Sequence, residues 1–259
     1  MTNAEKVWWL YKIAKEGQTT TIRSGCGLHG IYPYDKNHPH DFTRSESDAE
    51  HVFGCIMLAM NVMEIFPYLI PVERRYEVIR CLAVHELGEN DTGDVPDDGA
   101  RDNAKKDADE YEYVRNYLSC WDITSAGAGG DLIYPQCMKS VSAQQILKVF
   151  REMQEKSTEL GRFIYCVDKT EAILQNLIYE TQGRTGSFEG KKKFVKEMSE
   201  RDRMEVEATK SDKVADNWAY GFYDRCRNIE YFDIFFSIIR AAAKDVRGED
   251  FNWLPPDET

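Results

Sequence analysis

The sequence of 259 residues has no uninterrupted apolar run of about eighteen residues, the length typical of a membrane-spanning helix. Residues 1–17 are amphipathic but too short and too charged for a signal peptide or a membrane span. The seven cysteines include no CxxC pair, which argues against a zinc ribbon and against a disulfide scaffold. An odd number of scattered cysteines is typical of buried thiols in a reducing compartment. We therefore expect a cytoplasmic protein without membrane contact.

Positive charge is also in the minority. The chain has 33 Lys and Arg residues against 45 Asp and Glu residues, which gives a formal net charge of −12. Nucleic-acid backbones are bound through clustered Lys and Arg side chains, so this balance disfavours nucleic acid as a partner. A small phosphorylated ligand needs only a few local cations and is compatible with the composition.

The sequence lacks internal repeats, low-complexity linkers and sustained strand-like alternation, whereas apolar residues recur at helical spacing through most of it. We predict a single all-α domain over residues 1–259. The helix over 101–119 is expected to be largely exposed, and residues 19–43, 121–138 and 183–190 are expected to be loops. The expected helices lie near residues 7–17, 47–66, 71–90, 101–119, 142–156, 158–181, 191–210, 211–226 and 229–246.

The stretch AVHELGENDTGDVP at residues 83–96 is the most unusual in the chain. An apolar helical run leads directly into His85 and Glu86, which are followed by Glu89 and Asp94. Unpaired charge away from water is costly, so a buried helix end that collects ionisable groups indicates a use for them. A divalent metal and a phosphorylated substrate would neutralise such a cluster.

Three residues stand out because they lie within apolar helical stretches. His51 and His85 could each be a core histidine that bonds a carbonyl group. Asp168 lies in the middle of GRFIYCVDKTEAILQ, where an ion pair with a nearby Arg is the alternative to a binding role. Taken together, imidazole and carboxylate groups form a ligand set that suits a first-row divalent ion with open positions for water and substrate.

Three segments of the chain carry a family resemblance. They are RSESDAEH at 44–51, HELGENDTGDVP at 85–96 and DKTEAILQ at 168–175. These segments resemble the three motif blocks of the HD-domain metal-dependent phosphohydrolases, and within that superfamily they look most like the 5′-deoxynucleotidase group. The resemblance covers roughly residues 5–180. It implies an all-α HD-type helical bundle and a homodimer. We expect the C-terminal helices near 190–246 to pack on this bundle.

The resemblance also implies roles for individual residues. Glu89 would orient or activate the attacking water, and Asp94 would meet the substrate near the sugar and the scissile phosphate. Arg23 would bind phosphate, with Arg44 and Lys169 as alternatives. The metal, which the resemblance leaves open among Mn, Co, Fe, Ni and Zn, would be held by His51, His85, Glu86 and Asp168.

The expected reaction is release of phosphate from a nucleotide, most simply a nucleoside or deoxynucleoside 5′-monophosphate. Hydrolysis of a triphosphate or a pyrophosphate ester is an alternative within the same superfamily. The dipeptide His85-Glu86 departs from the His-Asp pair that names the family, and Glu places its carboxylate one methylene farther out. A catalytically inactive nucleotide-binding or scaffold protein is therefore a further alternative, although Glu is a competent hard-oxygen ligand.

Other residues could add ligands. Cys55 and Cys81 each lie four residues from a candidate histidine, so either could supply a thiolate or could simply fill the core. The segment His38-Pro-His40-Asp41 could form a second metal site, but a solvated turn is the simpler interpretation. The aromatic residues near the C-terminus could stack on a base, or could form a core or a subunit contact.

Overall fold

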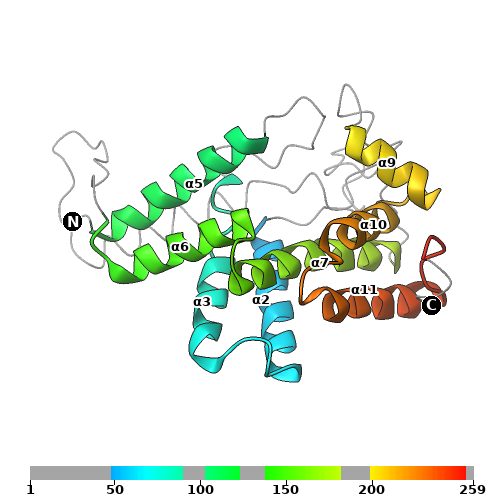
Figure 1. The fold of residues 1–259 in the computed structure, drawn as a ribbon, viewed down its shortest axis with the longest axis horizontal. Helices are drawn as coiled ribbons and strands as arrows, with labels where there is room; N and C mark the ends of the chain where they lie inside the picture. Colours follow the sequence, from blue (N-terminus) through cyan, green and yellow to red (C-terminus); the bar gives the residue numbers. More distant parts are fainter. Residues whose placement is uncertain (1–47, 90–102, 123–137, 182–198, 255–259) are drawn as a thin grey trace, which may run out of the picture. The chain divides into compact units, whose positions relative to one another are not determined.

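The computed structural model describes residues 48–89, 103–122, 138–181 and 199–254 (Figure 1). These residues form helices and contain no strand, which confirms the predicted all-α fold. No helix in this part of the chain is long and apolar enough to cross a membrane. The elements are α2 (Asp48–Ile65), α3 (Val72–Leu82), α5 (Asn103–Ser119), the short 3-10 helix η1 (Cys120–Asp122), α6 (Val141–Glu155), α7 (Glu159–Thr181), α9 (Glu200–Thr209), α10 (Val214–Cys226) and α11 (Phe232–Arg247).

Several sequence-based expectations lie outside the described residues. These are the helix near 7–17, the loops at 19–43 and 183–190, most of the loop at 121–138, and the candidate second metal site at 38–41. Of the helix expected at 191–210, the described part begins at Ser199, whose side chain caps α9 by accepting from the Asp202 amide.

The described residues group into two compact units. The first comprises 48–89, 103–122 and 138–165, and the second comprises 166–181 and 199–254. The helix α7 is common to both, because it begins in the first unit and continues without a break into the second. The single domain over residues 1–259 stays a prediction.

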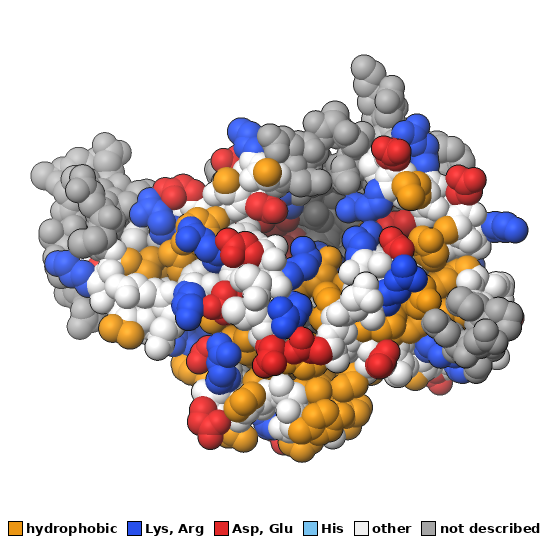
Figure 2. All heavy atoms as spheres, viewed as in Figure 1, with side chains coloured by type: hydrophobic (Ala, Val, Ile, Leu, Met, Phe, Trp, Pro, Cys, Tyr) orange, Lys and Arg blue, Asp and Glu red, His pale blue; other side chains and the backbone are white. Residues whose placement is uncertain are grey.

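The two faces of helix α2 differ in their exposure to solvent. Asp48 and Glu50 lie in its first turn, where acidic side chains interact favourably with the helix dipole. The helix ends at Ile65, shortly before Pro67. Buried apolar residues recur at helical spacing along one face of the helix, and exposed apolar residues recur along the opposite face. Figure 2 shows apolar side chains gathered over the end of α2 and the turn that follows it. The buried face carries His51, Val52, Cys55, Ala59, Val62 and Met63, and the exposed apolar residues are Phe53, Met57, Met60 and Ile65.

Helix α3 ends at Leu82, so the prediction that this helix runs to about Asn90 is wrong. Residues 83–88 form a turn in which the Leu87 amide donates to the Val84 carbonyl, at 3.0 Å. The His85 imidazole supplies the physical reason, because its Nδ1 donates to the Leu82 carbonyl at 2.7 Å. In a continuing helix that carbonyl would instead accept the backbone amide of the residue four positions later.

Helices α5 and α6 pack against each other in the first unit, and α3 packs on α2 and α6. The expectation that α5 is largely exposed is therefore only half right, because Val114 and Leu118 are fully buried. The Tyr111 ring of α5 stacks near Phe150, with ring centroids 6.4 Å apart. The guanidinium of Arg151 lies 4.1 Å from the centre of the Tyr111 ring. Helix α5 therefore has a narrow buried apolar face, although most of its residues are charged or polar.

In the second unit, α10 packs on α9 and on α11. Aromatic rings fill the space around α10 and α11: Phe232 stacks on Phe222 and on Phe236, with centroids 5.7 Å and 4.9 Å apart. These three rings are buried, so they belong to the core, which was one of the predicted alternatives.

Ionic contacts complete this unit. Arg247 bonds both oxygens of Glu180 and also contacts Asp216. Near the end of the described chain, Asp250 accepts from the Arg240 guanidinium at 2.7 Å.

Candidate metal centre

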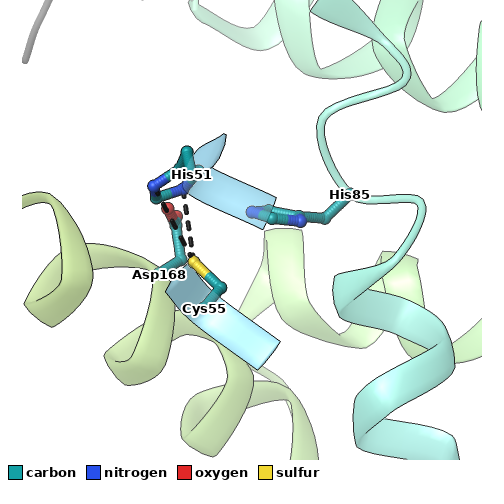
Figure 3. A group of neighbouring side chains, drawn as sticks. All are labelled: His51, Cys55, His85 and Asp168. Carbon is teal, nitrogen blue, oxygen red and sulfur yellow. Dashed lines mark hydrogen bonds between the residues drawn. The ribbon is translucent and has the colours of Figure 1, made fainter. Parts of the chain in front are cut away.

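Helix α2 contributes an imidazole and a thiol to one buried point. His51 and Cys55 lie one turn apart on the same face, and neither is exposed to solvent. The Cys55 Sγ atom lies 3.3 Å from Nε2 and 3.8 Å from Nδ1 of His51 (Figure 3). This arrangement follows from sequence spacing alone, because side chains four positions apart on a helix stand above one another.

The turn after α3 contributes the second imidazole and a carboxylate. The Glu86 Oε1 atom lies 3.4 Å from Nε2 of His51 and 3.2 Å from Nε2 of His85. The two imidazole rings are tilted, with centroids 5.5 Å apart. Because Nδ1 of His85 donates to a backbone carbonyl, Nε2 is the nitrogen that faces Glu86. One carboxylate oxygen therefore lies between two buried imidazoles.

The electrostatics of this cluster favour a cation. Burial alone would lower the pKa of His85, but the Glu86 carboxylate and hydrogen bonds with Cys55 and Glu86 raise that pKa to about 10. An array that holds a proton this firmly offers the same nitrogen and oxygen atoms to a metal ion, which competes with protons for its ligands.

Asp168 lies on α7 and is buried, at 3% exposure. Each of His51, Cys55, His85 and Asp168 offers one ligand atom, and these atoms lie within 4.8 Å of one another (Figure 3). The Asp168 Oδ2 atom also lies 2.7 Å from the Lys169 ammonium, which is half-exposed. The predicted phosphate ligand Lys169 is thus placed beside a predicted metal ligand.

Glu89 is held by a residue that sequence reasoning missed. The Lys106 ammonium on α5 lies 2.5 Å from Oε1 of Glu89 and 2.8 Å from Oε1 of Glu110. Burial acts to lower the pKa of Lys106, but the two carboxylates outweigh it and raise the pKa. The only signal in the sequence was the Lys106–Glu110 spacing of four residues on one helix face.

Gly88 makes this approach of the turn to α5 feasible. A Cβ atom at position 88 would lie 2.5 Å from the Cβ of Glu110 and 2.8 Å from its Cα. Only a residue without a side chain fits at that distance, so Gly88 sets the position of Glu89 beside Lys106.

The donor groups fit a transition metal. Buried imidazole, carboxylate and thiol groups suit a first-row divalent ion, whereas Mg²⁺ and Ca²⁺ prefer a shell of oxygen atoms. The structure brings together His51, His85, Glu86 and Asp168 near one another, and places Glu89 on the same turn as His85. The predicted substrate ligands Arg23, Arg44 and Asp94 lie outside the described residues.

Comparison with known protein families gives a match over about two thirds of the chain. The HD domain family matches residues 37–210, which include both histidines of the cluster, Glu86 and Asp168. A search of curated proteins finds no match. HD domains are all-α, bind divalent metals and generally act as hydrolases. Because the match covers well over half of its length, the chain belongs to the HD domain family.

Proposed function

We propose that the protein is a metal-dependent phosphohydrolase that releases phosphate from a nucleoside or deoxynucleoside 5′-monophosphate. The observation that carries the proposal is the Glu86 carboxylate oxygen, 3.4 Å and 3.2 Å from Nε2 of the two buried histidines. The choice of substrate is supported by the resemblance of the motif blocks at 44–51, 85–96 and 168–175 to the 5′-deoxynucleotidase group.

His51, His85, Glu86 and Asp168 would hold the metal. A bound divalent ion lowers the pKa of water and offsets negative charge that develops on a phosphoryl group. Glu86 replaces the Asp of the family dipeptide, yet its oxygen lies within 3.4 Å of both imidazoles. Its backbone belongs to a turn and not to a helix, which accommodates the additional methylene. This contact favours a working site over a degenerate one.

The chain's own residues would then perform the proton and charge transfers. Glu89 would take the proton from the attacking water, and Lys106 restrains the Glu89 carboxylate by an ion pair. Arg23, Arg44 or Lys169 would bind the non-bridging oxygens of the phosphate, and Asp94 would contact the substrate near the sugar. Of these residues, Lys169 is described, and its half-exposed ammonium is accessible to a ligand anion.

We further infer that the protein acts in the cytoplasm as a homodimer, with a small nucleotide as its partner and without nucleic acid or membrane. The exposed apolar side chains of Phe53, Met57 and Met60 on α2 support a protein contact at that helix face. The net charge of −12 argues against nucleic acid.

The test begins with the metal content of protein purified without chelators, compared with His85→Ala and Asp168→Ala variants. Bound transition metal that is lost in both variants is the expected result. Absence of metal even after reconstitution with Mn, Co, Fe, Ni or Zn would overturn the proposal.

Phosphate release is then measured with nucleoside mono-, di- and triphosphates. Glu89→Ala should lower turnover by roughly two to four orders of magnitude while metal stays bound, which is the usual loss for a general acid–base group. Glu73→Ala, which alters an exposed carboxylate on α3, is the matched control and should leave turnover unchanged. Equal turnover in the two variants would remove Glu89 from the mechanism.

A further inference from the structure

Cys55 shares the buried site of the two histidines. Its side chain is fully buried on the inner face of α2, with Sγ 3.3 Å from Nε2 of His51. Its sulfur also lies within 4.8 Å of the candidate ligand atom of His85. The thiol therefore contacts the imidazole of His51 on its own helix and lies near that of His85 on the turn after α3 (Figure 3).

Other buried cysteines of the described chain have different surroundings. The thiol of Cys120 donates to the Asn116 carbonyl at 3.3 Å, an ordinary helix contact. Cys81, four residues before His85, is fully buried, and burial together with the negative charge of Glu152 raises the pKa of its thiol. Among the described residues, Cys55 and not Cys81 belongs to the group with converging ligand atoms. The structure thus separates two cysteines that are equivalent by sequence spacing.

We propose that Cys55 binds the metal as a thiolate beside His51 and His85. The proposal rests on the metal centre of the proposed function and adds a sulfur ligand to it. Metal–nitrogen distances of about 2.0 Å and metal–sulfur distances of about 2.3 Å place neighbouring ligands roughly 3.0–3.5 Å apart, for angles at the metal between a right angle and the tetrahedral angle. The distance between Sγ of Cys55 and Nε2 of His51 is 3.3 Å, so these atoms already stand at ligand spacing.

Binding requires a simple exchange of bonds. The S–H bond breaks, the electron pair on sulfur forms the metal–sulfur bond, and the proton passes to solvent. A soft thiolate ligand shifts the preference of the site toward Zn, Co and Fe, and away from Mn, which favours oxygen ligands. In the alternative, the thiol only donates a hydrogen bond to an imidazole and does not touch the metal.

Cobalt distinguishes the two roles, because thiolate ligation gives Co(II) an intense charge-transfer absorption in the near ultraviolet. We expect this band in the Co(II)-loaded wild-type protein and in Cys81→Ser, the matched control. We expect Cys55→Ser to lose the band and to bind Co(II) more weakly by about tenfold or more. Co(II) binding without the band, or an unchanged band in Cys55→Ser, would overturn the proposal.

A second measurement needs no variant and so does not depend on the folding of Cys55→Ser. X-ray absorption at the zinc edge of the zinc-loaded wild-type protein should reveal a sulfur atom about 2.3 Å from the zinc ion. A shell of nitrogen and oxygen alone would overturn Cys55 ligation. Phosphate release by a cobalt-loaded protein without the band leaves the proposed function standing and refutes only the sulfur ligand. The band without phosphate release supports the sulfur ligand and counts against the proposed function.

Discussion

Lys106→Met removes a cation that two carboxylates share. The ammonium lies 2.5 Å from Oε1 of Glu89 and 2.8 Å from Oε1 of Glu110. The side chains of Lys106, Glu89 and Glu110 are 15%, 11% and 14% exposed, so water replaces the lost contacts poorly. The neighbouring Lys105 provides a matched control, since it pairs with Asp109 at 3.0 Å while its side chain is 73% exposed.

The exposures determine the expected magnitude. Removing one partner of a fully buried ion pair costs about 3–5 kcal/mol, whereas an exposed pair contributes about 0–1 kcal/mol. The exposures of Lys106, Glu89 and Glu110 are closer to those of a buried ion pair than to those of an exposed one. We therefore expect Lys106→Met to lower the free energy of unfolding by about 2–3 kcal/mol. Lys105→Met should lower it by less than about 0.5 kcal/mol.

Urea unfolding followed by circular dichroism measures both variants. The pKa of Lys106 is raised above 10.5 in the folded protein, so its contribution is complete below pH 10.5 and is lost as the pH rises through the folded value. The difference between wild type and Lys106→Met should accordingly be constant near neutral pH and shrink in strong alkali. Equal effects of Lys105→Met and Lys106→Met would refute the reasoning, because burial would then not control the strength of these pairs.

Other substitutions test other contacts, each by the midpoint of urea unfolding. Gly88→Ala should cost about 1–3 kcal/mol, because its Cβ would meet Glu110 at 2.5 Å; an unchanged midpoint would contradict a tight approach. Arg247→Leu should cost about 3 kcal/mol, since two carboxylates lose their shared cation, and a stabilised variant would contradict this. Burial acts to raise the pKa of Asp250, but the bond from Arg240 and neighbouring donors lower it below 3.8. Asp250→Asn should therefore cost about 1 kcal/mol at neutral pH, a loss that fades as the pH falls through that lowered pKa and that would be pH-independent if the charge were irrelevant.

Local spacing was enough to predict part of the site. His51 and Cys55 stand four residues apart within an apolar helix, so their shared face follows from helix geometry. The all-α class followed for the same reason, because helical periodicity extends through most of the chain. His85 and Glu86 were predicted as site residues at the end of a helix, whereas the structure places them in a turn after α3.

The remaining features depend on contacts that sequence spacing does not contain. The end of α3 at Leu82 depends on which group donates a hydrogen bond to the Leu82 carbonyl. In the structure the donor is the His85 side chain and not a backbone amide of a continuing helix. The partner of Glu89 lies 17 residues away on α5, and nothing in the sequence distinguishes Lys106 from Lys105. Only the packing of α5 in the first unit buries one of these lysines and exposes the other.

The short turn at residues 83–88 carries a consequence for insertions and deletions. Surface turns usually tolerate changes in length, because their side chains make few specific contacts with the rest of the protein. Here His85, Glu86 and Glu89 each reach a different partner, and each is placed by its count from the end of α3 at Leu82. Adding or removing one residue would move all three from their partners together, so this turn should be as intolerant of length changes as the interior of a helix.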